Sequence, residues 1–293
     1  MKNLLFILVI ITLIIILTIS IFNIIKWKFD SNKTNEEINN IQKNINVEEV
    51  EDTDNTEIVE PVEEIPKENP YWDYIKMNML NVDFSELKKI NNNVKGWIQV
   101  KGTNINYPFV QANDNKYYLT HSFDKSWNSA VWLFLDYINN YTNNKNTIIY
   151  AGRTDKTMFG SLKKVLSNEW LINSNNYIIK ISTEKENSLW QIFSIYHIPT
   201  TSDYLETNFS SDTEYLDFLN MLLTRSAYNF NTSINSNDNI LTLSTCYNNS
   251  DKMVVHAKLR TKDKLKFVAL VVTDQNSYFI DRVPSILHRL KFR

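Results

Sequence analysis

The chain has 293 residues, a formal net charge of −2 and 43% hydrophobic residues, which is enough for one sizeable domain with appendages. One cysteine excludes an internal disulfide and a multi-cysteine metal site, and four histidines without paired spacing argue against zinc. The near-neutral charge, with no basic patch interleaved with aromatic residues, argues against nucleic-acid binding. The sequence therefore indicates no cofactor, no metal ion and no nucleic acid.

Residues 4–25 are almost entirely Leu, Ile, Val and Phe. A stretch of about 22 such residues can span a bilayer as a helix. A cleaved signal peptide is the alternative, but Lys26, Trp27 and Lys28 follow where a cleavage site needs small residues. We therefore predict an uncleaved membrane anchor over residues 1–30. Lysines flank the apolar stretch on both sides, so the positive-inside rule leaves its orientation open.

Residues 31–69 are rich in Asn and Glu and poor in large apolar residues. Such a segment cannot bury enough surface to fold, and its like charges extend it. The composition predicts an acidic, disordered stalk, with a short coiled segment over residues 38–47 as the alternative. A folded domain is expected over residues 70–261. The basic tail, residues 262–293, either touches an anionic membrane or is a solvated terminus, and its role stays open.

The domain is predicted to be mainly β. Helix-like apolar spacing indicates two short helices over residues 72–90, and short β-rich runs with turn signals between them then indicate a barrel or a sandwich. Ser211 to Glu214 matches a capping box in front of an apolar face, which predicts one long helix before the last two strands. The expected strands are residues 96–100, 105–110, 131–136, 147–151, 177–182, 189–198, 240–246 and 253–259.

The single cysteine, Cys246, ends the apolar run 239–246 and is followed by the polar run 247–251. A thiol at a strand exit beside a polar loop can meet a substrate, as catalytic groups on loops held by a rigid scaffold do. A free cysteine is equally often a small core residue. The residues alone leave a nucleophile and a core thiol open.

Eight stretches of the chain, in order, resemble the class B sortases, which are membrane-anchored cysteine transpeptidases of Gram-positive bacteria. The resemblance implies an eight-stranded β-barrel with two N-terminal helices, one long helix before the cysteine strand and an N-terminal transmembrane helix. It also implies a single-pass protein of the cell membrane whose catalytic domain is extracytoplasmic. The stretches are Val94-Lys-Gly-Trp-Ile-Gln-Val100, Gly102-Thr-Asn-Ile-Asn-Tyr-Pro108, Tyr117-Tyr-Leu-Thr-His-Ser-Phe123, Phe134-Leu-Asp-Tyr137, Asn146-Thr-Ile-Ile-Tyr150, Thr157-Met-Phe-Gly-Ser-Leu162, Thr242-Leu-Ser-Thr-Cys246 and Val254-Val-His-Ala-Lys-Leu259.

The resemblance also implies the chemistry. A cysteine attacks a sorting signal near the C terminus of a surface protein, an arginine stabilises the oxyanion, a histidine serves as acid and base, and an amine of the cell wall precursor resolves the thioester. Cys246 matches the family cysteine. Leu119, Ser244 and Thr245 are the substrate-binding candidates.

The other catalytic positions depart from the family. Lys252 stands where the arginine is expected, and it keeps the charge without the planar fork of donors. Gly152 occupies the histidine's place, and Val131 and Trp132 replace a Gly-Ser pair. His121 is the best substitute base, although the family has an ordinary histidine there.

Two functions follow from these departures. Without a base, a cysteine is only a few per cent thiolate at pH 7, and the missing acid–base help is typically worth about 10²–10⁴-fold. We therefore expect a slow or impaired transpeptidase. The alternative is a pseudosortase that binds sorting signals or a partner protein without turnover; a decayed or wrongly read sequence is the third possibility.

Overall fold

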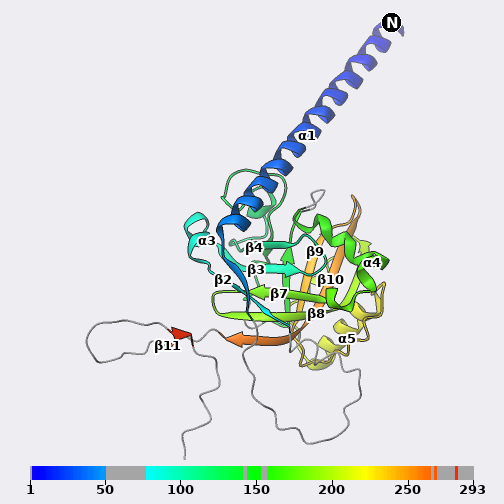
Figure 1. Ribbon diagram of the computed structural model, residues 1–293. Helices are drawn as coiled ribbons and strands as arrows, with labels where there is room; N and C mark the ends of the chain where they lie inside the picture. Colours follow the sequence, from blue (N-terminus) through cyan, green and yellow to red (C-terminus); the bar gives the residue numbers. More distant parts are fainter. Residues whose placement is uncertain are drawn as a thin grey trace, which may run out of the picture.

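Eight strands close into a barrel (Figure 1), which confirms the predicted mainly β architecture. The computed structural model describes residues 2–50, 77–140, 144–152, 157–264, 267–268 and 281–282. Around the barrel, the strands are β10 (Asp251–Lys264), β8 (Glu186–Pro199), β7 (Ile178–Ser182), β3 (Val94–Val100), β4 (Asn106–Val110), β5 (Phe134–Leu135), β6 (Asn146–Tyr150) and β9 (Ile240–Cys246).

Each barrel strand lies on one of the eight predicted runs, and the boundaries shift by a few residues. The strand β10 is twice as long as predicted, and the run 131–136 is shortened to Phe134–Leu135, because Val131 has a left-handed backbone (φ 59°) that breaks the extended conformation. Most neighbouring strands are antiparallel, while β4 with β5 and β6 with β9 are parallel. The parallel pairing of β6 with β9 places the C-terminal ends of both strands at the same end of the barrel.

The long helix α5 (Asp212–Thr224) begins as the sequence predicts. Ser211 caps it by accepting a hydrogen bond from the backbone N–H of Glu214, at 3.1 Å. The carboxylate of Glu214 accepts from Ser210 N–H at 2.7 Å, one residue before the position of a standard capping box. The helix covers the outer faces of β8, β9 and β10 with its buried residues Tyr215, Phe218, Leu219 and Leu222.

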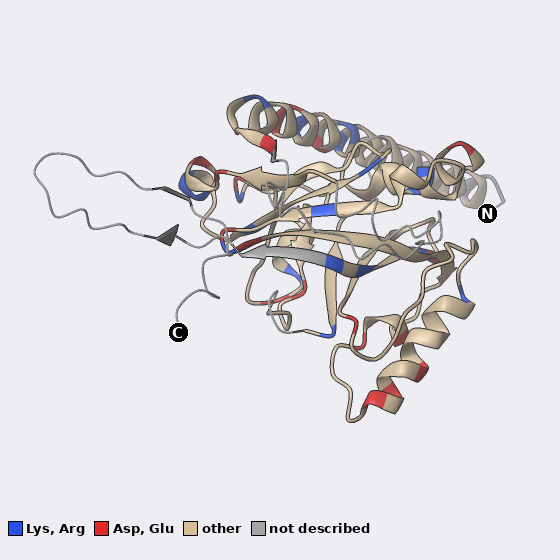
Figure 2. Cartoon of the chain, turned by 60° about the horizontal axis from the view of Figure 1, so that its bottom comes forward, with Lys and Arg blue, Asp and Glu red and all other residues tan. Residues whose placement is uncertain are grey.

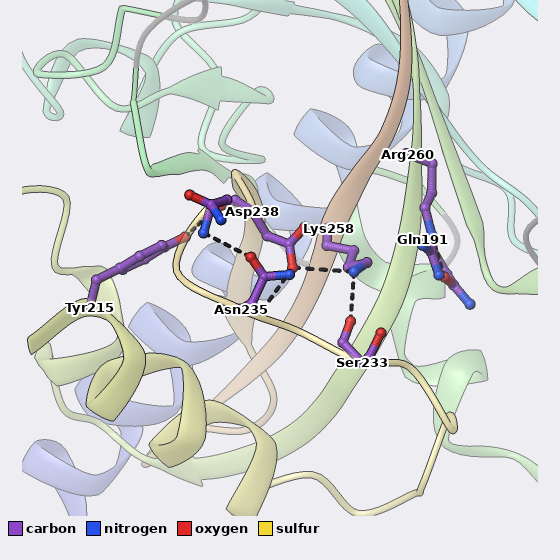
Figure 3. A network of polar contacts seen from close by, with 8 residues as sticks. Gln191, Tyr215, Ser233, Asn235, Asp238, Lys258 and Arg260 are labelled. Carbon is purple, nitrogen blue, oxygen red and sulfur yellow. Dashed lines mark hydrogen bonds and ion pairs between the residues drawn. The ribbon is translucent and has the colours of Figure 1, made fainter. Parts of the chain in front are cut away.

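A buried lysine ties the loop between α5 and β9 to the barrel (Figure 3). Lys258 Nζ on β10 donates to the carbonyl of Ser233 at 2.6 Å and lies 3.2 Å from Asp238 Oδ2. The hydroxyl of Tyr215 donates to the carbonyl of Asp238 at 2.8 Å, so α5 holds the same loop. Burial lowers the pKa of Lys258 and Asp238 opposes this shift. The loop is thereby fixed where it leads into the cysteine strand.

The shorter elements lie at the ends and on the surface of the barrel. They are α3 (Ser85–Ile90), α4 (Asn168–Leu171), and the 3₁₀ turns η1 (Tyr117–Leu119), η2 (Phe159–Leu166), η3 (Ser174–Asn176) and η4 (Asp203–Leu205). Of the two helices predicted before the barrel, α3 is confirmed. Residues 71–76 of the other lie outside the described residues, and its continuation is a strand, β2 (Met79–Val82), which pairs with β1 (Val47–Val50). Residues 79–82 form a strand rather than a helix because both Met79 and Leu80 are buried in this conformation.

The N-terminal helix α1 (Lys2–Asn44) is longer than the predicted anchor. The composition predicted an extended stalk from residue 31, but residues 31–44 continue α1, and Ile38 and Ile41 are buried in the core. Glu49 on β1 then pairs with the buried Lys180 at 2.9 Å. The helix continues because a few isoleucines spaced three to four residues apart stabilise it when they pack on the surface of the barrel. Residues 51–69 of the expected stalk lie outside the described residues.

Residues 5–25 of α1 carry no charge and are exposed, whereas acidic and basic residues mix along the part of the helix that lies against the barrel (Figure 2). This apolar part is long enough to cross a membrane. The first three residues of the predicted C-terminal tail, 262–264, continue β10, and beyond them the structure describes two short paired strands, β11 (Phe267–Val268) and β12 (Asp281–Arg282).

Candidate active site at the exits of strands β6 and β9

Cys246 is the last residue of β9, and its side chain is exposed. The strand register places it directly opposite Lys252, the second residue of β10. Residues opposite each other in an antiparallel pair project from the same face, and Lys252 Nζ lies 3.4 Å from Cys246 Sγ. The structure therefore brings the two predicted catalytic residues together on the outer face of the barrel, and it answers the open question of a core thiol.

Ser244 projects from the same face as Cys246, two residues earlier. Its hydroxyl is 2.9 Å from the hydroxyl of Tyr204, a buried residue of η4. Burial raises the pKa of Tyr204, and the nearby Cys246 raises it further, so the phenol stays neutral beside the thiol. No pattern in the sequence pointed to Tyr204, because η4 lies about 40 residues from the cysteine strand in the chain.

Thr245 alternates to the opposite face and is buried. Its hydroxyl donates to the carbonyl of Ala151 at 2.9 Å, so it ties the exit of β9 to the exit of β6. The third substrate-binding candidate, Leu119, lies in η1 with 44% of its surface exposed. Of the three candidates, therefore, Leu119 presents a free surface, while the hydroxyls of Ser244 and Thr245 are hydrogen-bonded within the protein.

Gly152, which we predict to stand at the position of the family histidine, is packed against the segment that precedes β5. Its N–H donates to the carbonyl of Val131 at 2.9 Å. A Cβ at Gly152 would lie 2.0 Å from the carbonyl oxygen of Ala130 and 2.7 Å from Cβ of Val131. Since the first of these obstacles is backbone, no side chain fits at this position without moving the segment. The following residues, 153–156, lie outside the described residues.

His256 shares the outer face with Cys246, because it pairs with Thr242 on β9. It is fully buried, and its Nε2 and Nδ1 atoms lie 2.8 Å from the hydroxyl of Tyr196 and 2.9 Å from that of Thr242. Thr242 donates its only hydroxyl proton to Asn146 Oδ1 at 2.7 Å, so Nδ1 of His256 must carry the hydrogen. Burial lowers the pKa of His256 to about 3, and the ring cannot serve as an acid at neutral pH.

His121 and His197 are engaged elsewhere. The ring of His121 stacks on Tyr117, with 4.1 Å between centroids, and its Nδ1 is 2.8 Å from the carbonyl of the same residue. His197 lies opposite Met253 and so faces away from the side of the sheet that carries Cys246. Its ring stacks on Tyr247 at 4.5 Å, and its Nδ1 is 3.7 Å from Asp251 Oδ2. Within the described residues, these histidines make no hydrogen bond or ring contact with Cys246.

A family model described as the sortase domain matches residues 98–260. The chain is 34% identical to sortase B of Listeria monocytogenes over 186 residues, which is 61% of this chain and 75% of the relative. It is 33% identical to sortase B of Staphylococcus aureus over 177 residues, 59% of this chain and 72% of the relative. A crystal structure of sortase B from B. anthracis superposes with a TM-score of 0.62 at 32% identity, covering 79% of this chain and 98% of that one.

This barrel is the fold of the sortases, a family of cysteine transpeptidases. The chain belongs to the sortase family, and within it to class B.

Proposed function

We propose that this class B sortase uses Cys246 as its nucleophile to cleave a sorting signal near the C terminus of surface proteins and to attach them to the cell wall, and that it does so slowly. The observation that carries the proposal is the contact of 3.4 Å between Lys252 Nζ and Cys246 Sγ at the exposed end of two paired strands. A cation beside the attacking sulfur is placed to stabilise the negative charge that develops on the carbonyl oxygen.

The reaction forms and breaks one bond in each half. The thiolate attacks a backbone carbonyl of the sorting signal, the C–N bond breaks, and the departing amine takes up a proton. An amine of the cell wall precursor then attacks the thioester carbonyl and loses a proton to solvent, and the C–S bond breaks with the sulfur as the leaving group. Lys252, as a cation, stabilises the oxyanion that forms on the carbonyl oxygen.

Impaired activity follows from the histidine position. Proton delivery to the departing amine needs an acid near the thiol. Of the described histidines, His256 is buried and neutral, His121 is held by Tyr117, and His197 stacks on Tyr247. Gly152 has no room for a side chain. Acid–base help of about 10²–10⁴-fold is therefore missing. His121 remains the substitute base that the sequence suggested, and it would have to leave its stacked position to act.

For the substrate, we propose that Leu119 offers an exposed apolar surface, that Ser244 acts through Tyr204, and that Thr245 positions the exit of β9. We further propose that α1 anchors the protein in the cell membrane by a single pass, with residues 70–261 on the extracytoplasmic side. The length and apolar character of residues 5–25 support the anchor.

A second function is a pseudosortase that binds sorting signals or a partner protein without turnover. The filled space at Gly152 favours it, because a working histidine cannot be regained there by one substitution. The exposed Cys246 beside Lys252 opposes it.

Intact-mass measurement separates the two functions. The full chain in detergent is incubated with a panel of C-terminal sorting-signal peptides, and Cys246→Ala is the control. We expect a slowly forming acyl adduct on the wild-type chain and none on the variant. Peptide binding without an adduct would establish the pseudosortase, and a folded chain that neither binds nor reacts would contradict both functions.

A further inference from the structure

The loop over residues 120–130 is bonded to the helix that continues from the membrane anchor. The carboxylate of Asp30 accepts a hydrogen bond from the hydroxyl of Ser129 at 2.5 Å, and Asn128 Nδ2 donates to the hydroxyl of Thr34 at 2.9 Å. Asp30 and Thr34 keep only 4% and 1% of their surface exposed. Buried, paired polar groups of this kind fix one geometry, so the barrel is clamped to α1 rather than tethered by a flexible linker.

Further contacts extend the clamp along the helix. Lys33 Nζ donates to the hydroxyl of Ser126 at 2.7 Å, and the N–H of Asp124 donates to Glu37 Oε1 at 2.7 Å. Together with Asp30 and Thr34, these residues cover about two turns of α1. The loop therefore follows the helix over the turns that come directly after the apolar stretch.

Trp127 lies at the end of this loop that is nearest to the anchor. Its ring lies beneath Lys26, with Nζ 3.9 Å from the ring centroid, and 49% of its surface is exposed. The 22 residues before Lys26 span about 33 Å as a helix, which matches the hydrocarbon core of about 30 Å. Lys26 is the first charged residue after that core, and Trp127 shares its depth.

We propose that Trp127 seats in the phospholipid headgroup layer around α1, so that the barrel rests on the membrane in one orientation. This inference rests on the membrane anchor of the proposed function. Tryptophan is enriched at membrane interfaces because its ring is apolar and its N–H is polar. Lys26 and Lys28 bring cations to the same level, where they meet lipid phosphates. The helix leaves the barrel on this side and projects away from it (Figure 1).

This orientation has a consequence for the active site. The loop runs on into Ala130 and Val131, which pack against Gly152, and Ala151 is bonded to Thr245. The exits of β6 and β9 therefore lie on the side of the barrel where the loop meets α1. The thiol is held toward the membrane surface, and a substrate reaches it along that surface.

Site-specific labelling in vesicles tests the proposal. In the full chain with Cys246→Ala, a polarity-sensitive fluorophore is attached either at Trp127→Cys or at Leu216→Cys, an exposed position on α5. Vesicles of phosphatidylcholine and phosphatidylglycerol carry a spin label at the headgroup. We expect the label at position 127 to be quenched roughly threefold or more compared with the label at 216. Equal quenching would overturn the proposal.

The clamp is tested in the same vesicles. Asp30→Ala should reduce quenching at position 127 toward the value at 216, whereas Glu36→Ala, an exposed acidic residue on the same helix, should leave it unchanged. If both variants leave quenching high, Trp127 touches lipid without the clamp, and the fixed orientation is refuted.

A second measurement keeps the loop free of a label. Brominated lipids should quench the tryptophan emission of the wild-type chain more than that of Trp127→Tyr; equal quenching contradicts the proposal. Flotation of the chain with the vesicles tests the membrane anchor separately from the position of Trp127. A chain that does not float with the vesicles refutes the anchor and this proposal together, and a chain that floats without quenching at position 127 refutes only this proposal.

Discussion

The exits of β9 and β6 lie side by side and differ in what they offer to chemistry. At the exit of β9, Cys246 is exposed and has Lys252 at 3.4 Å. At the exit of β6, Gly152 is enclosed by Ala130 and Val131, so that even a Cβ would meet backbone at 2.0 Å. One exit presents an exposed thiol, and the other has no room for a side chain larger than that of glycine.

The packing around Gly152 excludes a side chain at this position. Val131 has a left-handed φ of 59°, which is rare for a β-branched residue, and its side chain fills the space beside Gly152. The two positions depend on each other. A histidine introduced at Gly152 would therefore have to displace both Ala130 and Val131.

The largest expected effect is at the open exit. Lys252→Met should lower the rate of acyl-adduct formation by about 10²–10³-fold, because it removes the cation that stabilises the oxyanion. Lys252→Arg should keep the rate within a few fold, since it retains the charge and adds donors. The rate is followed by intact mass at a fixed peptide concentration. Equal rates for all three chains would show that the contact with Cys246 has no catalytic role.

At the closed exit, Gly152→His should destabilise the fold by about 3 kcal/mol and give no faster adduct formation, because the imidazole cannot enter without displacing Ala130. Gly152→Ala isolates the effect of Cβ and should cost about 1–3 kcal/mol. Urea denaturation of the full chain in detergent measures both. A stable Gly152→His chain with faster turnover would show that the segment before β5 yields easily.

Buried His256 lies on the same face of the sheet as Cys246, but it cannot donate a proton at neutral pH. Its pKa is about 3 in the folded chain and ordinary in the unfolded one, so the unfolded state binds more protons below about pH 6.5. Stability from this residue is present above that pH and is lost as the pH falls toward 3. Between pH 7 and pH 5 the loss is about 2 kcal/mol.

His256→Gln should remove this part of the pH dependence, while His197→Gln, a half-exposed histidine, should not. The free energy of unfolding of the three chains is compared at pH 7 and pH 5. An unchanged slope in His256→Gln would mean that the ring is protonated without cost in the folded state.

The smallest effect tests the coupling of Val131 with Gly152. Val131→Gly relieves the strain of the left-handed backbone. It also removes the Cβ of Val131, which would lie 2.7 Å from a Cβ introduced at Gly152. In a double-mutant cycle with Gly152→Ala, we expect a favourable interaction energy of about 1 kcal/mol. Additive effects would place the whole obstacle at the carbonyl of Ala130.

Local patterns predicted much of the fold. The eight strands, the start of α5 at Ser211 and the apolar stretch 5–25 each depend on periodicity, capping or composition within a short segment. The proximity of Cys246 and Lys252 could also be predicted from the sequence, because the two residues are six positions apart across one turn between paired strands. The resemblance to class B sortases then supplied the closed barrel.

What the sequence could not determine depends on contacts between distant segments. Residues 31–44 looked too polar to fold, yet they are helical because the loop 120–130 receives Asp30 and Thr34. Tyr204 reaches Ser244 from about 40 residues away. The sequence by itself determined which strands form and where the thiol stands in the chain. Three features depend on tertiary contacts: the thiol is exposed, Gly152 is enclosed, and α1 is hydrogen-bonded to the barrel. Each depends on which distant atoms occupy the neighbouring space.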